Sequence, residues 1–387
     1  MPDIQLSGFE SDASGAMSFS AMDTEGDRRL NFKLPLGYHQ DNDLLAIAIS
    51  TLLGTKYSNL TLDLAISDEA RTKLSDLISA PVQAKRSGTY MSPPISSGTT
   101  LNFSGGFDSL AAKVLLPEDA KLVALDFGGA FERERTFFDT FNPSVISTDF
   151  RAKGFARNSW SFMGIGSILL RDYLGVDTYS FGSILEAAPF NLSPNLRFKG
   201  AADPWMAAAG MRKLNPVLGL TEVGTAMLLN EYVPDLVRES LVSLAAPKSE
   251  KFTRKVVLQA LAEHAVGSRR RGYLFDVDQP SPHQCFGDSF ATDFLALYIL
   301  KKAGREVVGW LVSDIPSEII SAVQSMDLNF YERLNTNFYG SMEIPDVQRI
   351  YHRCLQAGIL PYDQNDWREF AAVTKMISQY HPIPGVK

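Results

Sequence analysis

From residue 99 onward, segments with the pattern of strands alternate with segments with the pattern of helices. The strand-like segments are TTLNF, KLVALDF, PSVISTD and DTYSFGS, and the helical ones are DSLAAKVLL, FERERTFFDTF and RNSWSFMGIGSILLRDYLG. This alternation predicts βαβ units, and therefore an α/β fold with a doubly wound parallel sheet. The helix expected over residues 157–174 is apolar nearly all round, so we expect it to be buried on more than one side.

Two other regions flank this pattern. Residues 1–97 contain strand-like segments (GAMSFSAMD, RRLNFKLPL, NLTLDLAIS) and helical ones (DNDLLAIAISTLLG, DEARTKLSDLI), which predict an N-terminal α+β unit. Asp41 or Asn42 is the expected cap of the first of these helices. The stretch 85–98 is rich in Ser, Gly and Pro and reads as a boundary loop. Four helical patterns after residue 246 predict a mostly helical C-terminal region. We therefore expect domains at 1–97, 98–245 and 246–387.

Composition narrows the class of protein. The chain has 387 residues, 45% of them hydrophobic and 21% charged, which is ordinary for a soluble globular protein. A net charge of −7 argues against a broad nucleic-acid-binding surface. The two cysteines, Cys285 and Cys354, exclude a cysteine-built zinc site and a disulfide framework, which fits a reducing cytosol. Because we find neither a signal peptide nor an apolar run that could span a membrane, we expect a cytoplasmic protein with no membrane partner. A homodimer is left open.

The turn after the first strand of the alternating region is unusual. In LNFSGGFDSLAAKVLL, residues 101–116, two adjacent glycines interrupt the passage from strand to helix. Glycines let backbone N–H groups approach an anion, and the helix dipole then favours phosphate. Ser104 and Ser109 add hydroxyl donors, whereas the carboxylate of Asp108 would repel phosphate unless a cation lay between them. The turn therefore predicts phosphate together with Mg²⁺ at Asp108. The alternative is a glycine turn, capped by Asp108 or Ser109, that binds no ligand.

The hexapeptide SGGFDS at 104–109 resembles the motif of the PP-loop ATP pyrophosphatases. It is neither a Walker loop nor a Gly-x-Gly-x-x-Gly turn. The segments 124–134, 156–187 and 215–244 resemble one branch of that superfamily, the cyano-deazaguanine synthases. The resemblance covers roughly residues 100–245 and is strongest at SGGFDS.

The resemblance implies an activity. The family transfers AMP from ATP to a substrate oxygen, releases pyrophosphate, and lets a nucleophile displace AMP. We therefore expect an ATP- and Mg²⁺-dependent synthetase that adenylates a small molecule with a carboxylate and passes it to a nitrogen nucleophile. Thiolation of a tRNA or of a small molecule is the alternative within the family. A non-catalytic protein that binds an adenine nucleotide is the alternative from another class.

The resemblance also implies site residues. The pyrophosphate end of ATP is expected at Ser104, Gly105, Gly106, Phe107, Asp108 and Ser109. The adenine is expected at Ala124, Leu125, Asp126 and Phe127. Catalytic or substrate-binding roles are expected for Arg133, Arg157, Asn158, Glu186 and Lys199. For Arg133 a solvated helix start, and for Glu186 a surface-loop carboxylate, are equally good interpretations.

The chain departs from the branch at two positions that bear on its chemistry. The branch carries a four-cysteine zinc site after the stretch matching residue 240, and here that stretch has no cysteine, so we expect no zinc. The branch has a lysine where this chain has Glu222. A phosphate-binding cation is then missing or comes from elsewhere, with Lys199, Arg212 and Lys213 as candidates.

Three further features allow two interpretations. The basic run SRRRGY, residues 268–273, is either a solvated loop, which we favour, or a segment that holds an anion. Asp203, which precedes Pro204, is a helix cap in the favoured interpretation and a second Mg²⁺ ligand in the other. His283 and Cys285 are a loop histidine and a packed cysteine unless a third partner joins them.

Overall fold

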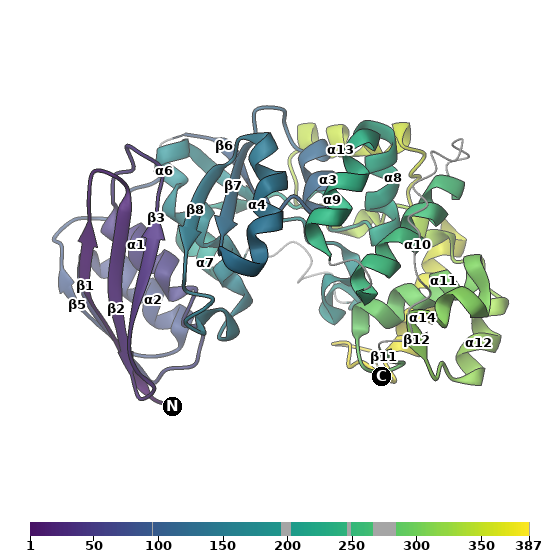
Figure 1. Ribbon diagram of the computed structural model, residues 1–387, viewed down its shortest axis with the longest axis horizontal. Helices are drawn as coiled ribbons and strands as arrows, with labels where there is room; N and C mark the ends of the chain where they lie inside the picture. Colours follow the sequence, from purple (N-terminus) through teal and green to yellow (C-terminus); the bar gives the residue numbers. More distant parts are fainter. Residues whose placement is uncertain (95, 195–202, 246–248, 266–283, 387) are drawn as a thin grey trace. The chain divides into compact units, whose positions relative to one another are not determined.

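The computed structural model describes residues 1–387 apart from 95, 195–202, 246–248, 266–283 and 387 (Figure 1). By packing, the chain divides into two compact units. The first comprises Met1–Ser104, Pro117–Phe181 and Ala202–Leu214, and the second comprises Gly105–Leu116, Gly182–Ala201 and Asn215–Lys387. These boundaries differ from 1–97, 98–245 and 246–387, which remain a prediction about domains.

The first unit is α/β, with one large and mostly parallel sheet (Figure 1). Among the described residues its ten strands lie in the order β10-β9-β6-β7-β8-β3-β2-β1-β4-β5. The pairs β1–β2, β2–β3 and β3–β8 are antiparallel and the other pairs are parallel. The strands are β1 (Asp3–Ser11), β2 (Ala16–Asp23), β3 (Gly26–Lys33), β4 (Asn59–Ile66), β5 (Val82–Arg86), β6 (Gly98–Asn102), β7 (Lys121–Asp126), β8 (Ser144–Thr148), β9 (Val176–Ser180) and β10 (Arg212–Lys213).

The N-terminal strands share this sheet with the strands of the alternating region. β3 pairs with β8 through Phe32–Thr148 and Lys33–Ser147. The predicted strands β2, β3, β4 and β6 to β9 are confirmed, whereas β1, β5 and β10 were not expected. In β1 only Ile4 and Leu6 are buried, so the alternation is too short to stand out in the sequence. The segment predicted as a separate front unit is therefore continuous, through its sheet, with the βαβ region.

The helices of the first unit follow the expected pattern except over residues 157–174. They are α1 (Asn42–Ser50), α2 (Asp68–Ile78), α4 (Glu132–Phe138), α5 (Ile165–Leu169), α6 (Arg171–Leu174) and α7 (Pro204–Ala208). Asp41 caps α1, and Asp203 caps α7 by accepting from the backbone of Trp205 and Met206. The cap interpretation of Asp203 is confirmed.

The single helix expected over 157–174 is wrong. The chain forms a 3₁₀ turn (Trp160–Gly164), then α5 and then α6, with a non-helical Leu170 between the two helices. Glycine is a weak helix former, and Gly166 lies so close to β7 that an added Cβ would stand 2.6 Å from Val123 Cγ1. The middle of the segment is buried as expected, with every residue of α5 buried, whereas Arg157, Trp160 and Tyr173 are exposed.

The direction in which successive strands are added to the sheet reverses at β6. From β6 the chain continues to β7 and then β8 on one side, while β9 pairs with β6 on the other side. In open α/β sheets, ligands bind beyond the carboxyl ends of the strands at such a point. The segment that leaves β6 here begins the SGGFDS turn.

The second unit is mostly helical, which confirms the helical C-terminal region (Figure 1). In it α8 packs on α3 and α10, and α10 also contacts α11. No helix in the described ranges is long and apolar enough to cross a membrane. Its elements are α3 (Phe107–Leu115), α8 (Glu222–Tyr232), α9 (Val237–Leu244), α10 (Glu250–Ala265), α11 (Phe290–Val308), α12 (Ser317–Gln324), α13 (Ile344–Gln356), α14 (Gln364–Ile377), β11 (Gln284–Cys285) and β12 (Val312–Ser313).

Candidate functional site

The glycine turn begins the second unit, and close contacts with neighbouring backbone restrict its conformation. Gly105 has a φ of +76°, which glycine adopts without strain, and Gly106 is the extended N-cap residue of α3. Ser240 donates a 2.8 Å hydrogen bond to the carbonyl of Gly105 and so fixes the turn from α9. Gly182 lies against the start of α3, because an added Cβ would stand 2.5 Å from the backbone nitrogen of Ser109. The turn is therefore held by backbone contacts that only small residues permit.

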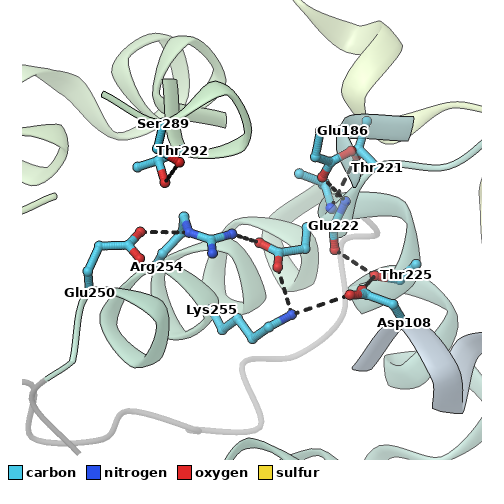
Figure 2. Close-up of polar contacts among 11 residues, drawn as sticks. Asp108, Glu186, Thr221, Glu222, Thr225, Glu250, Arg254, Lys255, Ser289 and Thr292 are labelled. Atoms are coloured by element: carbon cyan, nitrogen blue, oxygen red, sulfur yellow. Dashed lines mark hydrogen bonds and ion pairs between the residues drawn. The ribbon is translucent and has the colours of Figure 1, made fainter. Parts of the chain in front are cut away.

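Asp108 lies in the first turn of α3 and faces α8 and α10 (Figure 2). One carboxylate oxygen accepts a 3.1 Å hydrogen bond from Thr225 Oγ1, and the other lies 3.9 Å from Lys255 Nζ. The side chain of Asp108 is 27% exposed, so it remains accessible to a ligand. Burial and the charge of Glu222 raise the pKa of Asp108 against the opposing effect of Lys255.

Lys255 and Arg254 are buried cations that sequence reasoning missed (Figure 2). Lys255 Nζ lies 2.7 Å from Glu222 Oε1 and 4.9 Å from the centre of the Phe107 ring. Arg254 forms an ion pair with the other oxygen of Glu222, and its Nε donates a 2.7 Å hydrogen bond to Glu250. The signal was present as KFTRKVV, where basic residues interrupt an apolar helix. Nothing local indicates that both face a carboxylate on α8.

The two cations dominate the electrostatics of Glu222. Burial alone would raise the pKa of Glu222. Arg254 and Lys255 have the larger effect and lower this pKa to about 2, so the carboxylate is ionised at neutral pH. Burial lowers the pKa of Lys255, but Asp108 and Glu222 more than offset that effect and keep the ammonium charged. Position 222 therefore carries an ionised acid that pairs with a lysine from α10.

Glu186 is the second buried carboxyl group at the start of α8 (Figure 2). Its Oε1 accepts a 2.7 Å hydrogen bond from the backbone N–H of Glu222. Its Oε2 is buried and has no hydrogen-bond partner in the described part of the chain. Burial, with the nearby charge of Glu222, raises the pKa of Glu186 to about 8. The interpretation of Glu186 as a surface-loop carboxylate is therefore wrong, because the side chain is only 2% exposed.

The residues expected beside adenine lie in the first unit, at the end of β7. Asp126 is buried and accepts hydrogen bonds from the backbone of Gly128 at 2.9 Å, from Arg135 at 2.5 Å and from Ser147 at 3.1 Å. Its carboxylate is therefore occupied by partners within the unit. Phe127 packs edge to face against three other phenylalanine rings, at 5.3, 5.6 and 6.4 Å between ring centres. Ala124 and Leu125 lie within β7 itself.

The other predicted residues are divided between the units or lie outside the described residues. Arg133 is exposed on α4, and Arg157 is exposed in a 3₁₀ turn, both in the first unit. Asn158 follows and donates a 2.9 Å hydrogen bond to the Leu52 carbonyl. Ser104 closes a segment of the first unit, and residues 105–109 and Glu186 belong to the second. Lys199, His283 and the basic run 268–273 lie outside the described residues.

A magnesium ion would find limited protein ligation here. Asp108 offers one accessible carboxylate, and within the described ranges no group of three or more His, Cys, Asp and Glu residues could hold a metal ion. Mg²⁺ usually keeps several waters and binds through one or two carboxylates plus substrate phosphates. Asp108 therefore fits Mg²⁺ that arrives with a nucleotide better than a permanently bound metal.

Comparison with known proteins gives no family assignment. No protein-family model, no curated protein and no solved structure matches the chain.

Proposed function

We propose that the chain is an ATP-dependent synthetase that adenylates a small molecule carrying a carboxylate, releases pyrophosphate, and passes the activated group to a nitrogen nucleophile. The observation that carries the proposal is the pairing of Asp108 with Lys255 at the start of α3, where a carboxylate and an ammonium lie 3.9 Å apart. Phosphoryl chemistry with Mg²⁺ needs both charges, the carboxylate for the metal and the cation for phosphate oxygens.

The position of the turn supports the same proposal. The SGGFDS segment leaves β6 at the switch point of a mostly parallel sheet, which is where α/β folds bind nucleotides. A PP-loop arrangement of this sheet is the finer proposal about the fold. Bound Mg²⁺ would neutralise charge on the departing pyrophosphate. Asp108 would hold the metal, and Lys255, kept charged by Glu222, would stabilise the phosphates.

Calorimetry tests the proposal without knowledge of the substrate. MgATP should bind the purified chain more tightly than MgGTP. Asp108→Asn should weaken MgATP binding by about tenfold or more, because a contact to a charged group is lost. Thermal stability should fall by less than it does when Glu222 is neutralised, since Lys255 keeps its 2.7 Å ion pair with Glu222 and asparagine can still accept the hydrogen bond from Thr225. The matched control is Asp235→Asn, the same charge change at an exposed residue of the second unit. Unchanged MgATP binding in Asp108→Asn would contradict the proposal.

One observation favours a second candidate, a non-catalytic adenine-nucleotide-binding protein. Glu222 and Glu250 already neutralise Arg254 and Lys255, so a phosphate would meet little uncompensated positive charge. MgATP that binds but yields no pyrophosphate or AMP with any added carboxylic acid and ammonium would favour this candidate.

A further inference from the structure

Three buried polar atoms near the start of α8 have no hydrogen-bond partner in the described part of the chain. They are Glu186 Oε2, Asn335 Nδ2 and Tyr362 Oη. All three residues belong to the second unit and are less than a tenth exposed. Native proteins satisfy nearly all buried polar groups, so several unsatisfied atoms in one region need an explanation.

Backbone hydrogen bonds bring the three segments together. Leu185 N donates to the carbonyl of Leu220 at 2.8 Å, so the segment with Glu186 lies beside the residues that precede α8. Asn335 N donates to the carbonyl of Gly219 at 2.9 Å, and therefore reaches the same place.

Tyr362 is tied to the same region. Its backbone N–H donates to the carbonyl of Leu334 at 3.0 Å, one residue before Asn335. Its hydroxyl faces the side chain of Asn335 without reaching hydrogen-bond geometry. Burial raises the pKa of Tyr362, and the charges of Asp366 and Glu186 raise it further, so the field of Glu186 reaches the hydroxyl.

The chemistry of these atoms defines a small nitrogen ligand. A carboxylate oxygen accepts, a tyrosine hydroxyl accepts or donates, and an amide nitrogen donates. Aromatic rings complete the surroundings. The Tyr362 ring lies 6.0 Å from that of Phe330 and 5.9 Å from that of Phe370, and Phe330 stacks on Tyr331 at 4.3 Å. A carboxylate among aromatic rings is a composition that recognises ammonium groups.

Charge also favours a cation over a neutral occupant. Around Glu186 the carboxyls include the buried Glu222 and the partly exposed Asp108, with Arg254 and Lys255 as the buried cations. Both oxygens of Glu222 already engage these cations, so neither cation offsets Glu186. An added positive charge at Oε2 would supply the missing partner.

We propose that Glu186 Oε2 and Tyr362 Oη accept N–H donors from a primary ammonium group, either the ammonium ion or the amino group of a larger amine, while Asn335 Nδ2, itself a donor, faces the Tyr362 hydroxyl. The inference rests on the proposed function, in which this group is the nitrogen nucleophile. One proton passes from the ammonium nitrogen to Glu186 Oε2. A neutral amine with a free lone pair and a neutral carboxylic acid result, so charge and protons balance. The amine then attacks the activated carbon, AMP leaves with the bonding electrons, and the extra proton on the new amide nitrogen passes to water.

Ammonium itself is the first probe. Thermal unfolding of the full chain without nucleotide is followed in ammonium chloride, potassium chloride and sodium chloride at equal ionic strength. Ammonium should raise the midpoint above both other salts. Glu186→Gln keeps an acceptor for the Glu222 N–H but cannot ionise when ammonium binds, and should abolish the ammonium effect. Tyr362→Phe removes a hydroxyl to which the described residues make no hydrogen bond, so the fold should persist while ammonium affinity falls about tenfold.

The controls separate the possible occupants. Tyr232→Phe removes a hydroxyl at the last residue of α8 and should keep the full ammonium response. Methylammonium that acts as well as ammonium would identify the amino group of a larger molecule, whereas a weaker response would identify free ammonium. Potassium, which has a similar size but no N–H donors, should act like sodium.

The result of the ammonium test is independent of the result of the MgATP-binding test. If ammonium acts no differently from sodium, or if potassium matches it, the three atoms hold only water or a simple cation and the inference is overturned. MgATP binding is measured on the wild type and on the Tyr232→Phe control, and should be equal in the two. If the wild type does not bind MgATP, the proposed function is contradicted. The ammonium result would still show whether Glu186 and Tyr362 bind an ammonium group.

Discussion

Glu186 and Glu222 show how two carboxyls at one helix start acquire opposite properties. Each is less than a tenth exposed, and the backbone N–H of one donates to the side chain of the other. Glu222 has two cations within reach, whereas Glu186 has none in the described ranges. The pKa is therefore lowered to about 2 in one and raised to about 8 in the other. The partner, not burial, decides the sign.

A pH-dependent stability follows from Glu186. Its folded pKa of about 8 lies above the ordinary value of 4.5, so its contribution is fully present below pH 4.5 and is lost as pH rises through 8. Wild type should lose stability from pH 5 to pH 8 relative to Glu186→Gln, by a few kcal/mol at about 1.4 kcal/mol per pKa unit. Urea denaturation of both proteins across that range measures the difference. Parallel curves would mean that Glu186 is already ionised in the folded protein.

Gly182 gives a test of the close packing around the turn. In Gly182→Ala the new Cβ would stand 2.5 Å from Ser109 N, so the backbone must shift. We expect a loss of about 1–3 kcal/mol, as for overpacked cores. Gly340→Ala is the matched control, because nothing lies within 4 Å of its added Cβ. Urea midpoints should fall for the first variant only; equal midpoints would show that the turn can give way freely.

At the scale of elements, α8 and α10 are joined by a buried ionic network rather than by apolar contacts alone. Glu222 of α8 faces both Arg254 and Lys255 of α10. Buried charges are costly unless they are paired, so each member depends on the others. The same contact positions Lys255 beside Asp108 of α3.

Neutralising Glu222 should therefore weaken the packing of α8 on α10. Glu222→Gln leaves two buried cations with less compensation, and we expect a loss of about 3–5 kcal/mol. Glu239→Gln on α9 is the control, since that residue is exposed and the same change there should cost almost nothing. The comparison uses the chemical-denaturation midpoint of each protein. A Glu222→Gln protein as stable as the control would show that water reaches these cations.

At the scale of the whole molecule, the packing of the first unit crosses the predicted boundary at residue 97. The hydrophobic core of this unit is built from side chains spread along the chain, the first being Ile4 and the last Met211. Phe32 of β3 packs 6.1 Å from the ring of Phe150, and β3 pairs with β8. The N-terminal segment therefore relies on partners far along the chain.

A fragment of residues 1–97 should not fold by itself. It would expose part of the core and leave β3 as an open edge, which favours aggregation. Circular dichroism and amide NMR of the fragment, compared with the full chain, provide the measurement. A well-dispersed spectrum with cooperative melting would support the predicted domain at 1–97 instead.

The sequence by itself determined the local elements. Alternation predicted most strands, apolar periodicity predicted α10, α11, α13 and α14, and the caps at Asp41 and Asp203 were readable because capping involves neighbours in the chain. The SGGFDS turn also showed where chemistry is expected, since its glycines and Asp108 are local features. The prediction of elements from the sequence failed where the apolar periodicity was short, as in β1, or where glycines interrupt an apolar run, as in 157–174.

Only the tertiary structure decided which distant residues meet. The joining of β3 to β8, the membership of α3 in the helical unit, and the approach of Lys255 to Glu222 and Asp108 depend on packing between remote segments. Glu186 illustrates the same limit. Its residue type was visible, but its burial, its unpartnered oxygen and its raised pKa arise from neighbours that come from other parts of the chain. Short-range patterns carry no information about such neighbours, because burial and charge pairing are properties of the assembled fold.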